Sequence, residues 1–122
     1  GGRGGEGGGG GLFAKVSDLV AATFRAAWRK VLPVGAGPGD VLYHLFAYDL
    51  MVEETGEVVL LEVNGYPAIH SGTMSNVPVE VYSRLVVDIA TFLALPAADG
   101  RPPDPGGWVR VAELDEDPSR PP

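Results

Sequence analysis

The chain has 122 residues, of which 45% are hydrophobic and none is cysteine, and its 16 acidic residues outnumber nine basic ones. This length allows one small domain and excludes a complete large enzyme, since domains usually span roughly 100 to 200 residues. Without cysteine there are no disulfides, thiolate zinc sites or cysteine nucleophiles, and a net charge of −7 argues against a nucleic-acid partner.

The first predicted element is a helix that follows a glycine-rich arm. Nine of residues 1–11 are glycine, a composition typical of flexible coil, and we expect no structure there. From Leu12 to Val31 apolar residues recur at spacings of three and four, which indicates an amphipathic helix that Pro33 stops. Residues 34–40 are interpreted as a linker rather than a phosphate-cradling loop, because they follow a helix and lead into a strand.

Residues 41–65 predict a β-hairpin. Branched, aromatic and aliphatic side chains fill this segment and are interrupted only by the letters EETGE. A two-residue turn at Thr55 and Gly56, or a four-residue loop over 54–57, places Asp49 opposite Glu62. One face would then be apolar and pack on helices, with Phe46, Tyr48, Leu50, Val52, Val59, Leu61 and Val63. The other face would carry Ala47, Asp49, Met51, Val58, Leu60, Glu62 and Asn64.

A second helix is predicted from about Asn76 to Leu95, with Asn76 as N-cap and Pro96 as its end. Its buried stripe would consist of Val81, Leu85, Ile89, Phe92 and Leu93. Residues 97–122 are rich in proline and acidic residues and are expected to be disordered. The elements together predict an α+β fold of helix, antiparallel hairpin and helix over residues 12–96.

Two features bear on the context of the chain. It opens on Gly rather than Met and shows no signal pattern, so we expect a fragment or an internal segment. No apolar run approaches the roughly 18 residues that a membrane span needs, so we expect a soluble chain with no membrane partner.

Two carboxylates face each other across the predicted hairpin. Directly opposed residues have Cβ atoms about 4.5 to 5.5 Å apart, and like charges so placed are destabilising. From Asp40 to Asn64 there are six acidic residues and no Lys or Arg, so no basic neighbour in sequence neutralises Asp49 and Glu62. Asn64 shares their face and completes an all-oxygen set that suits Mg²⁺ on nucleotide phosphates. The simpler alternative is that both acids are solvated on the polar face of the sheet.

The two histidines, His44 and His70, are too far apart in sequence to be paired from spacing alone. His44, at the start of the first strand, is interpreted as structural. His70, in the loop after Asn64, is interpreted as an exposed loop residue, with contact to an acceptor substrate as the alternative.

The segment LFAYDLMVEETGEVVLLEVNGYPA resembles the last metal-binding segment of the ATP-grasp ligases, and most closely that of the tubulin tyrosine ligase family. The shared pattern is LF..D.MV, then the acid of LLEVN thirteen positions after the Asp, then G.PA. The resemblance implies the C-terminal part of an ATP-grasp fold. It also implies that Asp49, Glu62 and Asn64 hold Mg²⁺ on ATP and that Leu61 contacts the adenine.

The resemblance further implies an ATP-dependent ligase that adds an amino acid, tyrosine or glutamate, to a tubulin tail. Such an enzyme is expected in the cytoplasm, on microtubules or in cilia. The phosphate-gripping lysines of ATP-grasp enzymes are not identifiable here, so we expect these 122 residues by themselves to be inactive. Two alternatives stay open: an ATP-grasp ligase with a small-molecule or ribosomal-protein acceptor, and a non-enzymatic interaction module.

Overall fold

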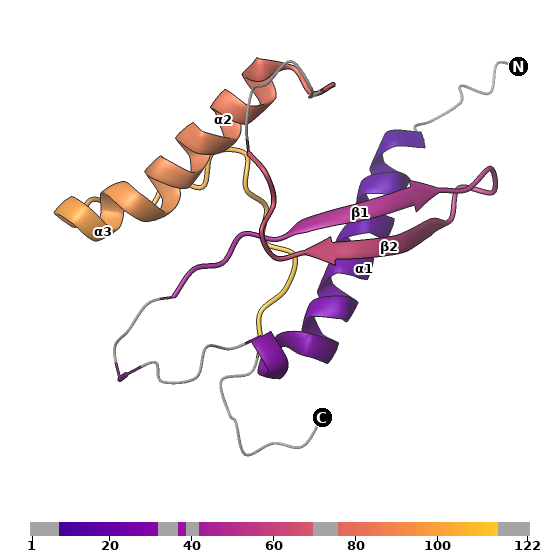
Figure 1. Ribbon diagram of the computed structural model, residues 1–122, viewed down its shortest axis with the longest axis horizontal. Coiled ribbons are helices and arrows are strands. Elements are labelled where there is room, and N and C mark those ends of the chain that lie inside the picture. Colours follow the sequence, from indigo (N-terminus) through magenta and orange to yellow (C-terminus); the bar gives the residue numbers. More distant parts are fainter. Residues whose placement is uncertain (1–7, 32–36, 39–41, 70–75, 115–122) are drawn as a thin grey trace, which may run out of the picture. The chain divides into compact units, whose positions relative to one another are not determined.

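The computed structural model describes residues 8–31, 37–38, 42–69 and 76–114 (Figure 1). The chain divides into two compact units, Gly1–Pro67 with Val111–Pro122, and Ala68–Arg110. The first unit contains a helix and a two-stranded antiparallel sheet, and the second contains a continuous helical segment. The predicted α+β class, with helix, hairpin and helix in chain order, is confirmed.

The first helix, α1, spans Gly8–Val31 and includes the amphipathic stretch predicted from Leu12. It begins earlier than predicted, because residues 8–11 of the glycine-rich arm are helical. Extending an existing helix adds one hydrogen bond per residue fixed, so a nucleated helix can continue into glycines that would not form one alone. Pro33 and most of the predicted linker lie outside the described residues.

The hairpin consists of β1, Ala47–Val52, and β2, Val58–Asn64. Its turn is a three-residue loop over residues 54–56 rather than the two- or four-residue loop predicted, since the Glu53 N–H donates to the Glu57 carbonyl oxygen at 2.9 Å and the Gly56 N–H donates back to the Glu53 carbonyl oxygen at 2.9 Å. Gly56 has a φ of +84°, a left-handed conformation that favours glycine and closes loops of this length. An odd number of loop residues shifts the strand register by one.

A β-bulge in β2 restores the predicted register at the open end of the hairpin. Asp49 pairs with Glu62 as predicted, whereas Leu50 pairs with Leu60, so Leu61 is the extra residue. The prediction that Leu61 faces the core is wrong: its side chain is 58% exposed.

The bulge also corrects the predicted faces between the turn and Leu61. Val58 and Leu60 pair with residues of the apolar face and are half-buried, whereas Val59 pairs with Met51 on the face of Asp49. The sequence-based register contained no bulge, so it placed Val58 and Leu60 on the face of Asp49, and Val59 and Leu61 on the apolar face, the reverse of what the structure has.

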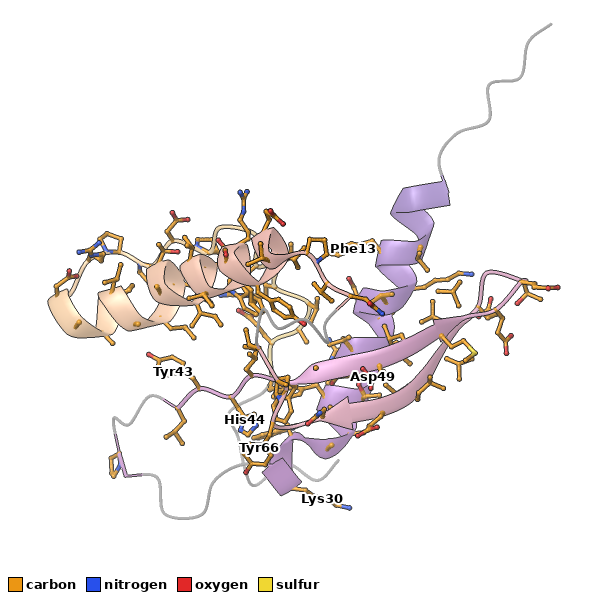
Figure 2. The ribbon with its side chains drawn as sticks, turned by 45° about the horizontal axis from the view of Figure 1, so that its top comes forward. Phe13, Lys30, Tyr43, His44, Asp49 and Tyr66 are labelled. Atoms are coloured by element: carbon orange, nitrogen blue, oxygen red, sulfur yellow. The ribbon has the colours of Figure 1, made fainter. Side chains whose placement is uncertain are left out.

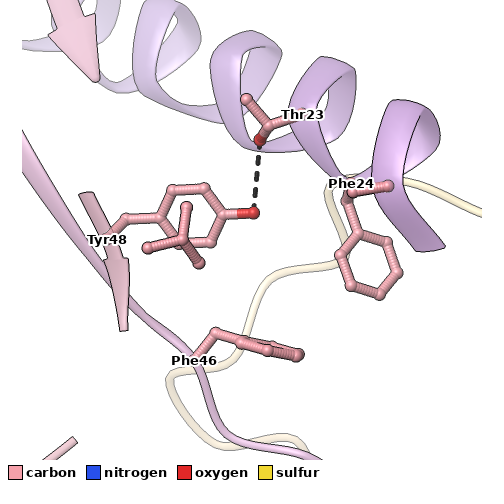
Figure 3. Close-up of a pocket in the computed structure, with 6 residues that line it drawn as sticks. Thr23, Phe24, Phe46 and Tyr48 are labelled. Atoms are coloured by element: carbon pink, nitrogen blue, oxygen red, sulfur yellow. Dashed lines mark hydrogen bonds between the residues drawn. The ribbon is translucent and has the colours of Figure 1, made fainter. Parts of the chain in front are cut away.

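Helix α1 packs along the apolar face of the hairpin. Near the turn, Lys15 Nζ donates to the Gly56 carbonyl oxygen at 2.9 Å. Toward the open end, the hydroxyls of Thr23 and Tyr48 lie 3.2 Å apart, beside a cavity of about 230 Å³ (Figure 3). The cavity is lined by Thr23, Phe24, Ala27, Phe46, Tyr48 and Val63. The core is thin, because Ala21 is the only buried apolar residue among those that the structure describes.

Substitution of two glycines tests this account of the turn. Gly56→Ala is expected to lower the free energy of unfolding by about 1 kcal/mol, because alanine disfavours a left-handed conformation. Gly11→Ala is the matched control: it lies within α1 with no atom within 4 Å of an added Cβ, so it should raise stability by about 0.5 to 1 kcal/mol. Urea denaturation measures both, and a Gly56→Ala chain as stable as the unsubstituted one would contradict the turn geometry.

The second unit is built on one continuous helical segment: α2, Val79–Ile89, the π-helical turn η1, Ala90–Ala94, and α3, Leu95–Asp99. Two predicted boundaries are wrong. Pro78, not Asn76, is the N-cap residue, with no side-chain cap, since a proline before the first helical residue already has a suitable φ. The helix also continues through Pro96.

The π-helical turn explains how the helix passes Pro96. The Leu95 N–H donates to the Ala90 carbonyl oxygen, five residues back, so the ladder is already widened where the proline enters. Pro96 then occupies the first turn of α3, where the backbone N–H that it lacks is not needed. Gly100, with φ +74°, ends the helix.

The segment after Gly100 returns along this helix. The Asp104 N–H donates to the Thr91 carbonyl oxygen at 3.1 Å, and the Gly107 N–H donates to Asp88 Oδ2 at 3.1 Å. Hydrogen bonds from the Arg101 side chain and backbone lower the pKa of the Asp99 carboxyl. These contacts differ from the unstructured tail predicted from residue 97, of which residues 115–122 lie outside the described part. The domain boundaries at 12 and 96 stay predictions.

By length and composition, the 21-residue segment Val79–Asp99 would be able to cross a membrane. The sequence-based expectation of no such segment did not anticipate this, because it considered uninterrupted apolar runs only. Glu80, Arg84 and Asp88 interrupt the segment. Core helices of soluble proteins share this length and composition, so the absence of a membrane partner stays a prediction.

Candidate functional site

The structure brings together the two carboxylates that the sequence singled out. Asp49 on β1 and Glu62 on β2 are direct partners across the antiparallel ladder, and both are exposed. Figure 2 labels Asp49 on its strand. Among the described residues, ion pairs join Lys15 to Glu57 and Arg101 to Asp99, and neither includes this pair. The two negative charges therefore lie opposite each other without a compensating basic group in the described part of the chain.

The bulge at Leu61 lies directly beside Glu62. Bulges re-aim the side chains that flank them and increase the local twist of the strands. Counting alternation from Val59, which pairs with Met51, places Leu61 on the same face as Asp49. The exposed apolar side chain of Leu61 therefore lies on the same face as the acidic pair, whereas the sequence-based register placed Leu61 on the opposite face.

Asn64 occupies the last pair of the ladder, opposite Ala47. It follows Glu62 by two residues and so lies on the same face. Its Oδ1 accepts a hydrogen bond from the Tyr66 N–H at 2.9 Å, which holds the side-chain oxygen in a defined direction. A carbonyl oxygen has two lone pairs, so this bond leaves Oδ1 with capacity for a second partner.

An aromatic group continues the hairpin beyond Asn64. The ring of His44 stacks on Phe46, with centroids 4.2 Å apart and an interplanar angle of 17°, and its Nε2 lies 2.7 Å from the Gly65 carbonyl oxygen. Tyr66 meets the His44 ring edge-on at 5.9 Å, and Figure 2 labels both residues. Sequence reasoning identified His44 as structural but missed its bond to Gly65, because no local signal marks a contact between residues 21 positions apart. His70 lies outside the described residues.

The donor set fits a hard divalent cation that is only partly ligated by protein. Two carboxylates and one amide oxygen are available, and within the described ranges no three His, Cys, Asp or Glu side chains gather into a site. Mg²⁺ commonly binds through one or two carboxylates and completes its octahedron with waters and substrate phosphates. The exposure of Asp49 and Glu62 leaves room for such additional ligands.

Comparison with models of protein families relates most of the chain to a known family. A family model described as the tubulin-tyrosine ligase family matches residues 7–99, a range that contains the helix, the hairpin and the second helical segment. Searches of curated proteins and of solved structures found no match.

Proposed function

The chain belongs to the tubulin-tyrosine ligase family, and we propose that it contributes the Mg-ATP site of an ATP-dependent ligase. The observation that carries the proposal is the direct pairing of Asp49 with Glu62 across the hairpin, with no basic partner among the described residues. In this proposal the helix, hairpin and helix are the C-terminal part of an ATP-grasp fold.

Each residue of the site has a proposed role. Asp49 and Glu62 would bind Mg²⁺ through their carboxylates, and Asn64 would bind it through Oδ1. When bound, the ion would offset the negative charge of the ATP phosphates and align the transferred phosphoryl group with the attacking carboxylate. Leu61 would offer its exposed side chain to the flat apolar surface of the adenine.

The full-length enzyme would activate a carboxylate with ATP and join it to an amino group by an amide bond. Family membership supports tubulin as the partner. In this proposal the amino acid added is tyrosine or glutamate, and the modified segment is the C-terminal tail of tubulin. This activity would belong to the cytoplasm, on microtubules or in cilia. An acceptor other than tubulin, in an ATP-grasp ligase for a small molecule or a ribosomal protein, is the alternative that the same site would also serve.

Calorimetric titration of the full-length protein with ATP, with and without Mg²⁺, tests the site. We expect clearly tighter binding with Mg²⁺, because the ion neutralises both the phosphates and the acidic pair. Equal affinity in the two titrations, or no binding, would favour the non-enzymatic interaction module. Incorporation of labelled tyrosine or glutamate into tubulin then tests the acceptor.

The 122 residues alone are expected to show no ligase turnover. Lysines that grip the nucleotide phosphates are not identifiable in this sequence, and with a net charge of −7 the chain would repel ATP in the absence of a cation. A ligation assay with ATP, Mg²⁺, tubulin and labelled amino acid measures this directly. Turnover by this chain alone would show that it holds a complete active site.

A further inference from the structure

A single peptide group connects His44 with Asn64. The carbonyl oxygen of Gly65, which lies 2.7 Å from His44 Nε2, and the N–H of Tyr66, which donates to Asn64 Oδ1 at 2.9 Å, belong to the same peptide unit. No cis peptide bond occurs in the described residues, and in a trans unit the C=O and N–H point in opposite directions. Fixing the carbonyl of Gly65 therefore fixes the direction in which the Tyr66 N–H points.

His44 is itself well placed to act as an anchor. Its ring stacks on Phe46, and Phe46 meets Phe24 of α1 edge-on at 6.2 Å, so the imidazole is linked to the helix through two aromatic contacts. A carbonyl oxygen can only accept, so Nε2 carries the proton of the bond to Gly65. The ladder pairs end at Ala47 with Asn64, so no strand pairing holds the following Gly65–Tyr66 peptide.

We propose that His44 is a positioning residue that orients Asn64 Oδ1 through the Gly65–Tyr66 peptide, and thereby raises the affinity of the hairpin for Mg²⁺. The inference rests on the proposed function, since it assumes that Asn64 is a ligand of the ion. Hydrogen bonding at the carbonyl also polarises the peptide and strengthens the bond that its N–H donates. His44 thus acts on a proposed ligand oxygen, Asn64 Oδ1, without contacting the ion itself.

Two substitutions in the full-length protein separate the hydrogen bond from the ring. His44→Phe keeps the stacking on Phe46 and removes the donor, whereas His44→Gln keeps an N–H donor at similar reach and removes the ring. We expect His44→Phe to weaken Mg²⁺ binding, measured by calorimetry, about 3- to 10-fold, the range that one hydrogen bond contributes. His44→Gln should recover at least half of that loss. Without metal, the Tyr66 amide should exchange faster in His44→Phe, as measured by nuclear magnetic resonance.

A double substitution shows whether the effect passes through Asn64. If it does, adding His44→Phe to Asn64→Ala should weaken Mg²⁺ binding no further than Asn64→Ala alone. Additive losses, or a His44→Phe protein that binds Mg²⁺ like the unsubstituted one, would overturn the proposal. Should His44→Phe fail to fold, His44→Asn, whose donor is too short to reach Gly65, takes its place in the same comparisons.

Asp49→Asn distinguishes this proposal from the proposed function. If Asp49→Asn weakens Mg²⁺ binding and His44→Phe does not, the metal site stands and the positioning role is wrong. If neither substitution alters Mg²⁺ binding, the metal site itself is wrong, and the role of His44 falls with it.

Discussion

Asp49→Asn and Glu62→Gln are each expected to weaken the Mg²⁺-dependent binding of ATP by the full-length protein on the order of 10- to 100-fold. Each substitution removes one of the two carboxylates that the hairpin offers. The same substitutions should raise the stability of the metal-free protein by about 0.2 to 1 kcal/mol, because they remove a repulsion between directly opposed charges. Weaker ATP binding together with higher stability of the metal-free protein would show that the acidic pair contributes to binding and not to stability.

Glu54→Gln is the matched control. It removes one negative charge from the turn of the same hairpin, outside the acidic pair. Titration with Mg-ATP and urea denaturation should leave this variant close to the unsubstituted protein in both properties. Losses of affinity as large in Glu54→Gln as in Asp49→Asn would mean that general charge, and not the pair, is responsible.

Leu60→Asn and Leu61→Asn should differ sharply although the residues are neighbours. Leu60 pairs with Leu50 on the face that α1 covers, so Leu60→Asn is expected to lower the free energy of unfolding by about 2 kcal/mol. Leu61 is the exposed residue of the bulge, so Leu61→Asn should change stability by less than about 0.5 kcal/mol. In the full-length protein Leu61→Asn should instead weaken ATP binding, through the lost apolar contact with adenine.

Urea denaturation of the two variants and calorimetry with Mg-ATP measure these effects. Equal destabilisation by the two substitutions would mean that both side chains are buried and that β2 runs without a bulge. A stable Leu61→Asn protein with unchanged ATP affinity would support the bulge and remove the proposed adenine contact.

The pairing of Asp49 with Glu62 was predictable from the sequence, but for an incomplete reason. The prediction assumed an even-numbered loop and an uninterrupted ladder, whereas the structure has an odd-numbered loop and one extra residue at Leu61. From Glu62 to the open end of the hairpin the two changes cancel, so the predicted pairing holds. Between the turn and the bulge they do not cancel, so residues 58–61 lie on the faces opposite to those predicted. A bulge has no strong signal in a run of aliphatic residues, because every alternative register keeps such side chains on both faces.

The helices show the same division between what local patterns determine and what they do not. Apolar periodicity identified both helices, because it persists over many residues. Their ends were misplaced, because Gly8–Gly11 and Pro96 have poor helix propensity and are helical here only as extensions of a neighbouring turn. The contact of His44 with Gly65 joins residues distant in sequence, and only the folded hairpin brings them together.

A crystal structure of the full-length protein with Mg²⁺ and a non-hydrolysable ATP analogue tests the central claim most directly. We predict an ion with one oxygen of Asp49 and one of Glu62 each about 2.1 Å away, and with phosphate oxygens among its other ligands. An ion held on the nucleotide by other residues, with both carboxylates in solvent, would contradict it.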